Sequence, residues 1–130
     1  MELSPAKIRY LLSIYELYME HPESIRPVDV ARRLKISRAS VTVMLKELEE
    51  QNLVSRNTDS GIEFTPKGQK TAMTYYTQYR TFLRFFLQNL QIDGINARED
   101  CISLVSSLSE ESLRSLSRYV KDSRLHYILS

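Results

Sequence analysis

One side of a predicted helix at residues 37–50 carries short and hydroxylated side chains, where a helix needing only solubility would usually carry Glu, Lys and Gln. Short side chains let a helix backbone come close to base-pair edges, where Val43 could contact a thymine methyl group and Lys46 a phosphate. The residues that could make such contacts are Ser37, Arg38, Ala39, Ser40, Thr42, Val43 and Lys46. They predict a surface that reads the major groove of double-stranded DNA.

Apolar residues on the opposite side must hold this helix in place. They recur at three- and four-residue steps and therefore share one buried side. These residues are Val41, Met44, Leu45 and Leu48. Ser37 stands where an N-cap is wanted, and a shorter amphipathic helix at residues 28–34 precedes the turn before it. This order predicts a helix-turn-helix whose second helix is the reading helix.

Many of the chain's cations gather around this motif. Residues 26–46 hold six Lys or Arg residues and one carboxylate, a net charge of +5, although the whole 130-residue chain carries only +2. Such a patch indicates a polyanionic partner, and Arg32 joins the predicted DNA contacts. A solvated surface would carry similar charges, but it would not need the short side chains beside them.

A predicted hairpin follows the reading helix. Strand-forming residues at 53–57 and 62–64 flank the sequence Thr-Asp-Ser-Gly, which is typical of a turn. Three helices followed by a hairpin is the order of a winged helix. Arg56, Asn57 and Ser60 near the tip suit contacts with phosphates or the minor groove, although a hairpin tip that is only polar would have the same composition.

The first and fourth helices begin with the same signal. Ser4-Pro5 and Thr65-Pro66 each combine an N-cap residue with a first-turn proline. The helix that starts at Pro66 should continue to about residue 90. Its broad apolar face is expected to be core or a dimer interface. The predicted dimerisation residues are Tyr75, Tyr79, Phe82 and Phe86.

Two further helices complete the prediction. After a turn at Asp93-Gly94, a helix is expected at residues 96–107 with Leu108 facing inward, and another from residue 110 should break at residues 122–123. The fold class is therefore mainly α. A winged helix-turn-helix DNA-binding domain at residues 1–68 precedes an all-α dimerisation domain at residues 69–130.

Composition excludes several classes of protein. With two His and three Gly residues and no paired carboxylates, nucleophile–base pair or glycine-rich phosphate loop, the chain is not expected to be an enzyme. A single cysteine excludes an internal disulfide and suits a reducing compartment. No signal peptide is evident, and no stretch approaches the roughly 20 apolar residues of a membrane span. We expect a cytoplasmic protein with no membrane partner.

The sequence resembles the DtxR/MntR repressors, the family of the diphtheria-toxin and manganese-transport regulators. The resemblance rests on YLLSIY at residues 10–15, VDVA at 28–31, SRASVTVM at 37–44, LEEQNLV at 48–54, GIEFTPKG at 61–68 and FL at 86–87. It implies the shorter, manganese-regulator type without an SH3-like third domain. It further implies a homodimer that binds a palindromic operator as a transcriptional repressor.

The resemblance fails at the metal site. Family members bind Mn²⁺ or Fe²⁺ through carboxylate, Met and His side chains, whereas the corresponding positions here hold Arg9, Leu12, Arg80, Ile102, Val105 and Ser106. Arg, Leu and Val side chains cannot ligate a divalent cation. We therefore expect no metal cofactor, although kinship alone would imply Mn or Fe.

Arg80 interrupts an apolar stripe and has two interpretations. It could replace the charge of the metal by pairing with Glu16, Glu99 or Asp100, or it could extend to solvent at the edge of an interface. For the whole chain, the leading interpretation is a sequence-specific regulator of unknown effector. The alternatives are a winged-helix module that binds protein, and a regulator that still responds to a metal through other ligands.

Overall fold

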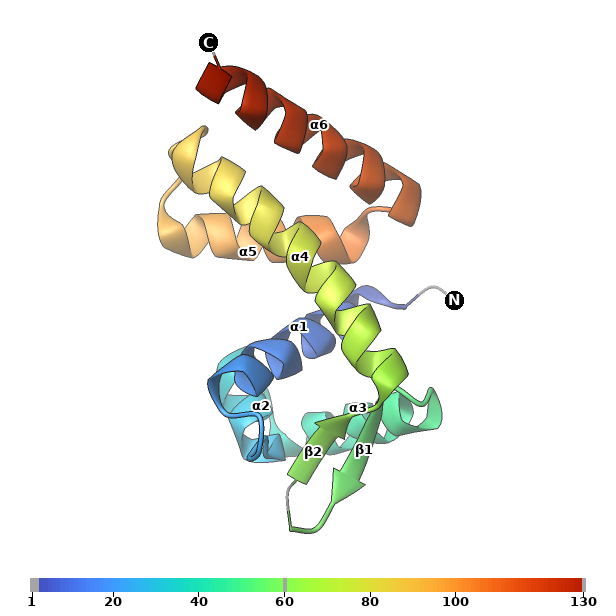
Figure 1. Cartoon of the computed structure of the whole chain (residues 1–130). Coiled ribbons are helices and arrows are strands. Elements are labelled where there is room, and N and C mark those ends of the chain that lie inside the picture. Colours follow the sequence, from blue (N-terminus) through green and yellow to red (C-terminus); the bar gives the residue numbers. More distant parts are fainter. Residues whose placement is uncertain (1–2, 60, 130) are drawn as a thin grey trace. The chain divides into compact units, whose positions relative to one another are not determined.

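The computed structural model describes the backbone of residues 3–59 and 61–129, and the side chains up to residue 122. Six helices and one antiparallel hairpin follow one another along the chain (Figure 1): α1 Pro5–Glu20, α2 Pro27–Leu34, α3 Arg38–Glu50, β1 Val54–Asn57, β2 Gly61–Phe64, α4 Pro66–Gln88, α5 Gly94–Ser107 and α6 Glu110–Leu129. They form two compact units, Met1–Thr74 and Tyr75–Ser130. The predicted boundary between residues 68 and 69 lies six residues earlier along α4.

Short polar signals set the ends of helices in the first unit. The Ser4 hydroxyl accepts a hydrogen bond from the backbone N–H of Lys7 at 3.2 Å. The Thr65 hydroxyl accepts from the backbone N–H of Gly68 at 2.9 Å. These contacts satisfy N–H groups that have no partner within their own helix. Asn52 adopts the left-handed conformation directly after α3, with φ 61°, as suits a helix C-terminus.

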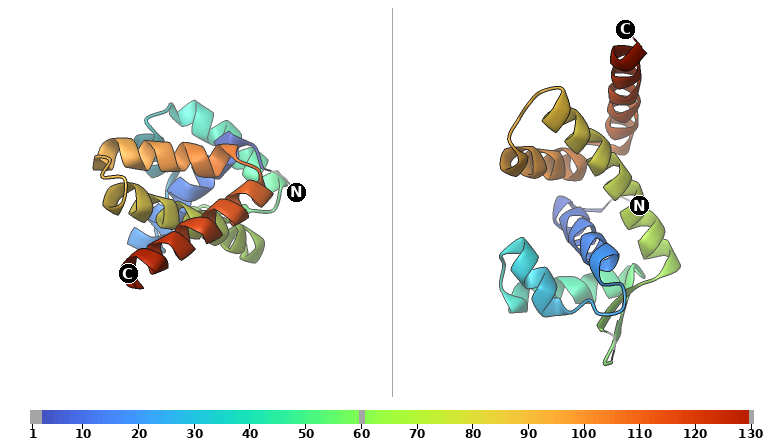
Figure 2. Two further views of the ribbon diagram at one scale, coloured as in Figure 1. Left: turned by 90° about the horizontal axis from the view of Figure 1, so that it is seen from above. Right: turned by 60° about the vertical axis from the view of Figure 1, so that its left-hand side comes forward.

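The first unit packs α1, α2, α3 and the hairpin around one apolar core. Figures 1 and 2 show the β1–β2 hairpin extending from the three helices. Its register pairs Val54 with Phe64 and Asn57 with Gly61. The core residues of this unit with at most 1% of their surface exposed are Leu11, Ile14, Ile25, Val30, Val41, Leu45, Leu48, Leu53, Ile62 and Ala72. This core fixes α3 on the side that carries its apolar residues.

Two glycines allow the hairpin to lie against neighbouring backbone. Gly61 has φ 81°, and a Cβ there would overlap the carbonyl of Ile25, which accepts a hydrogen bond from Ile62 at 2.8 Å. A Cβ at Gly68 would overlap the carbonyl of Leu53. The hairpin is therefore joined to the chain before α2 at one place and to the first turn of α4 at the other.

The second unit consists of helices only. Its core includes Phe82, Ala97, Cys101, Val105 and Leu113, each with at most 1% of its surface exposed. Burial raises the pKa of the Cys101 thiol to about 11, so this cysteine stays protonated and unreactive.

Three expectations for this unit are wrong. Helix α6 continues through Asp122 and Ser123 instead of breaking there. Gly94 is the first residue of α5 rather than part of a turn, because Asp93 caps that helix by accepting from the backbone N–H of Asn96 at 3.0 Å. Leu108 ends α5 and is 36% exposed instead of facing inward.

The predicted dimerisation residues are largely buried within the single chain. Tyr75, Tyr79 and Phe82 expose 8%, 4% and 1% of their surfaces, while Phe86 is half-buried. The first three therefore belong to the core of one chain and leave little surface for a second copy. Their assignment to a dimer interface stays a prediction.

Candidate nucleic-acid interface

Helix α3 keeps one face in the core and presents the other to solvent. Val41, Leu45 and Leu48 are fully buried. The side chains on the free face are all exposed: Arg38, Ala39, Ser40, Thr42, Val43 and Lys46. Val43 exposes 62% of its surface on this face, so its methyl groups are accessible to a partner. The face predicted to read DNA is thus free, and no element of its own unit covers it.

The hydroxyl groups on this face already have hydrogen bonds within the helix. Ser37, at the N-cap, accepts from the backbone N–H of Ser40 at 3.1 Å and donates to the Ser40 hydroxyl at 2.9 Å. Thr42 donates to the carbonyl of Arg38 at 3.0 Å. Since the Thr42 proton is used internally, this residue offers an approaching ligand its lone pairs and its methyl group. In this rotamer Thr42 can therefore accept from a base amino group or contact a thymine methyl group.

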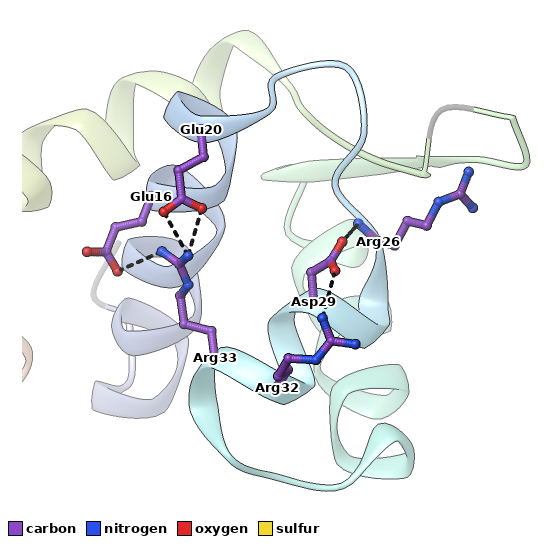
Figure 3. Close-up of polar contacts among 6 residues, drawn as sticks. All are labelled: Glu16, Glu20, Arg26, Asp29, Arg32 and Arg33. Atoms are coloured by element: carbon purple, nitrogen blue, oxygen red, sulfur yellow. Dashed lines mark hydrogen bonds and ion pairs between the residues drawn. The ribbon is translucent and has the colours of Figure 1, made fainter.

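One cation of the basic patch is paired with carboxylates. Arg33 of α2 donates to both carboxylate oxygens of Glu20 at 2.8 and 2.7 Å, and its Nη1 lies 3.7 Å from Glu16 (Figure 3). The paired guanidinium holds the pKa of Glu20 below its ordinary value. Arg33 therefore fastens α2 to the end of α1 and is not free to meet a polyanion. No local pattern in the sequence indicates this role, because thirteen residues and a loop separate the partners.

Arg32 and Arg26 remain available beside the motif. Arg32 lies 3.8 Å from Asp29, but its side chain is 77% exposed. Asp29 also accepts from the backbone N–H of Arg26 at 3.1 Å, and the Arg26 side chain points away from it (Figure 3). Asp29 thus works mainly on the backbone at the start of α2, where a carboxylate also suits the helix dipole.

The hairpin places two predicted contact residues at the surface. Arg56 and Asn57 are exposed on β1. The Asn57 side-chain oxygen accepts from the backbone N–H of Asp59 at 2.9 Å, which supports the chain as it enters the turn. Ser60, the third predicted residue of the tip, lies outside the described residues.

Comparison with known proteins shows the family to which this chain belongs. A family model described as "Iron dependent repressor, N-terminal DNA binding domain" matches residues 2–62. An HTH-type transcriptional regulator of Methanocaldococcus jannaschii is 30% identical over 112 residues, which are 86% of this chain and 90% of that protein. The chain belongs to the DtxR/MntR family. It is an HTH-type transcriptional regulator with a DNA-binding domain, not an enzyme.

Longer family members share most of this chain. The transcriptional regulator MntR of Salmonella typhimurium is 31% identical over 104 residues, which cover 80% of this chain and 65% of MntR. The solved structure of the manganese regulator SloR superposes with a TM-score of 0.75 at 26% identity, covering 93% of this chain and 55% of SloR. This chain spans less than two thirds of either regulator. The comparisons confirm the mainly helical fold, with a DtxR-type helix-turn-helix, a small wing and a helical region after it.

The positions that the sequence predicts to correspond to the family's metal ligands do not form a ligand set in the described structure. Leu12 and Val105 are buried in apolar cores, and Ile102 is half-buried. The Ser106 hydroxyl donates to the carbonyl of Ile102 at 2.7 Å. Within residues 3–59 and 61–122, no three His, Cys, Asp or Glu side chains lie close enough together to share a metal ion. These residues do not fit the metal that the DtxR/MntR family implies.

Arg80 forms no ion pair with the predicted carboxylates of its own unit. Its side chain is exposed. Among the described residues of the second unit, no ion pair joins Arg80 to Glu99 or Asp100. Glu16 instead lies beside Arg33. The predicted link of Arg80 to Glu99 or Asp100 is therefore wrong for this structure, and the link to Glu16 stays a prediction.

No helix among the described residues is long and apolar enough to cross a membrane.

Proposed function

We propose that this regulator binds a palindromic operator sequence-specifically as a homodimer and represses transcription. The observation that carries the proposal is the free face of α3, where Val43 is 62% exposed among short side chains. A helix held by its apolar side and bare on the other can enter a major groove. Arg32, Arg38, Lys46 and Arg56 surround that face with positive charge that suits the phosphates.

Exposed apolar side chains of the second unit support the homodimer. Ile95 and Tyr119 expose 72% and 69% of their surfaces. Leu87, Leu90 and Leu108 are 40%, 48% and 36% exposed. Covering such side chains with a second copy would remove apolar surface from water at about 25 cal/mol per Å². Two copies related by a two-fold axis would present two reading helices to an inverted repeat.

We further propose that DNA binding does not depend on Mn²⁺ or Fe²⁺. Support comes from the side chains at the family's ligand positions, where buried Leu12 and Val105 have no donor atom and the Ser106 hydroxyl is bonded to its own helix. Restoring a site would require a metal to displace apolar core residues. No repression step in this proposal is assigned to a metal.

Selection from a random pool of DNA duplexes tests both parts. EDTA-treated protein should enrich an inverted repeat, and a footprint should cover both halves. The logarithm of affinity should fall linearly with the logarithm of salt concentration, because phosphate contacts release counterions. Failure to enrich any sequence would overturn sequence-specific regulation and favour a protein-binding module.

Adding metal ions to the same protein tests whether its operator affinity depends on them. Mn²⁺ or Fe²⁺ added to the EDTA-treated protein should leave the operator affinity within about twofold, since no coordinated ion contributes to folding or binding. A gain of tenfold or more would overturn metal independence while leaving the DNA-binding proposal intact.

A further inference from the structure

The C-terminal half of α3 carries negative charge at the end of the helix that is proposed to read DNA. Glu47, Glu49 and Glu50 are all exposed there, and the last turn of α3 has no basic residue of its own. The C-terminal end of a helix adds partial negative charge from its free carbonyl groups. This end of α3 should therefore repel the phosphates of a duplex unless another part of the protein supplies a cation.

The three carboxylates differ in where they lie around the helix. Glu47 follows Val43 by four residues, and positions four apart share a face of a helix. Its carboxylate therefore lies on the face that is proposed to meet DNA. Glu49 lies about 120° around the helix from Val43, and Glu50 lies about two turns beyond it, at the end of the helix. On the face that holds Val43, Glu47 is thus the nearest carboxylate.

Lys7 of α1 supplies a cation to Glu47. Its Nζ lies 3.6 Å from Oε1 of Glu47, and the two side chains are 19% and 46% exposed. The lysine stem is therefore packed, whereas the carboxylate is open to an approaching ligand. The backbone N–H of Lys7 donates to the Ser4 hydroxyl at 3.2 Å. The ammonium group thus reaches α3 from a packed stem on a capped helix turn.

The other two carboxylates have no such partner. Among the described residues, no ion pair joins a cation to Glu49 or Glu50. An exposed ion pair adds little to the stability of a fold, so stability gives little reason for the cation to meet Glu47 in particular. Proximity to the phosphates of a bound duplex gives a reason, because it singles out the carboxylate beside Val43.

We propose that Lys7 neutralises Glu47 and thereby allows the exposed face of α3 to approach the phosphates. DNA affinity then depends on a residue of α1, outside the helix-turn-helix. Lys7 acts through Glu47 and needs no contact of its own with a base or a phosphate. This inference rests on the proposed DNA binding by α3. Because neutralisation carries no sequence information, it should affect all duplexes alike.

Gel-shift titration of the full chain at low salt tests the inference, with a random-sequence duplex as the probe. Lys7→Met keeps the packed stem but leaves Glu47 charged, so it should weaken binding about three- to fivefold. Glu47→Gln leaves the cation in place and should strengthen binding by a similar factor. The two changes combined should return the affinity to within about twofold of the wild type. These differences should shrink as salt rises, because exposed charges are screened.

Matched variants separate this effect from a change in overall charge. Lys70→Met removes an exposed cation of α4 in the same unit, and Glu49→Gln removes an exposed carboxylate from another side of α3. Each should change affinity less than about twofold. Urea unfolding should show that all variants stay folded. If the pair served stability alone, Glu47→Gln would lower the free energy of unfolding without strengthening DNA binding, and the inference would be overturned.

Two further results would overturn the inference. One is a Lys7→Met loss no larger than that of Lys70→Met. The other is a combined Lys7→Met and Glu47→Gln variant as weak as Lys7→Met, because Lys7 would then meet a phosphate itself. A wild type that bound no duplex would overturn the proposed function and this inference with it. A wild type that bound DNA beside an unaffected Lys7→Met variant would overturn this inference alone.

Discussion

The helix-turn-helix unit and the helical unit after it use exposed apolar and charged residues differently. In the first unit, Val43 is exposed on a face of short and cationic side chains, and the cation Arg33 is neutralised by Glu20 and Glu16. In the second unit, Ile95 and Tyr119 are the most exposed large apolar side chains of the described residues, and Arg80 and Arg84 keep their charge beside a cavity.

This contrast concerns how many charged and apolar side chains of each unit have partners within that unit. Caps, glycine contacts and ion pairs stabilise the first unit, and one face of α3 stays exposed where a duplex could meet it. The second unit leaves apolar surface and positive charge unmatched. In the proposed homodimer, a second copy covers the apolar surface. The first unit therefore resembles a complete folding unit with one helix face proposed to meet DNA, and the second unit has apolar surface proposed to meet a second copy.

The largest expected effect is on the free energy of unfolding, and it compares a glycine of the first unit with a glycine of the second. Gly68→Ala should lower the free energy of unfolding by about 3 kcal/mol or more, because the new methyl group would overlap the backbone carbonyl of Leu53. Gly94→Ala is the matched control. Its Cβ would meet only the mobile Nη1 end of Arg98 at 3.4 Å, so stability should change by about 0.5 kcal/mol or less. Urea unfolding followed by circular dichroism measures both, and equal effects would contradict the interlocked hairpin.

The next largest effect is expected on the association of two chains into a dimer. Ile95→Glu places a charge on a side chain that is 72% exposed in the single chain. If a second copy covers it, the dimer should weaken by about 2 kcal/mol or more while each chain stays folded. Met73→Glu, on the first unit and 47% exposed, serves as the control. Sedimentation equilibrium measures the change. A wild type that is monomeric at micromolar concentration would contradict the dimer.

Local signals made the first unit predictable from sequence. The hydroxyls of Ser4, Ser37 and Thr65 each accept a hydrogen bond from a backbone N–H in the first turn of the helix that follows. Asn52 takes the left-handed conformation expected after the reading helix. Such signals act over three or four residues, and the apolar periodicity of α3 depends equally on near neighbours. The exposure of its predicted reading face follows from the same pattern.

Contacts between distant residues could not be predicted in this way. The Arg33–Glu20 pair joins two helices across a loop, and nothing local marks it. Asp122 and Ser123 resemble a helix end, yet their helical propensities are only some tenths of a kcal/mol below those of good helix formers, and α6 continues through them. The cavity beside Arg80 needs residues forty positions apart on α4 and α6. The helical periodicity of the sequence showed only that Arg80 falls within an apolar stripe of its helix.

Substitutions on α3 should affect DNA binding without affecting either unit's fold. Thr42→Val keeps the methyl group and removes the lone pairs, so it should alter preference among operators by about 1–3 kcal/mol per affected base pair if the oxygen accepts from a base. Val43→Ala should have a similar effect if its methyl groups meet thymine. Lys46→Ala should weaken binding to all sequences and reduce the salt slope by about one unit. Gel-shift assays on matched and mismatched duplexes measure these changes, and unchanged affinity in all three would exclude α3 as the reader.

The smallest expected effect concerns the ion pair that completes the first unit. Because Arg33 holds the pKa of Glu20 below its unfolded value, the pair stabilises the fold above about pH 4.3, and this contribution disappears as pH falls through the folded pKa. Glu20→Gln should therefore be less stable than wild type near pH 7, and the two should converge at acidic pH. Glu23→Gln, which removes an exposed carboxylate three residues away, should change stability equally little at both pH values. Urea unfolding measures the difference, and a Glu20→Gln deficit that persisted in acid would mean that packing rather than charge joins α2 to α1.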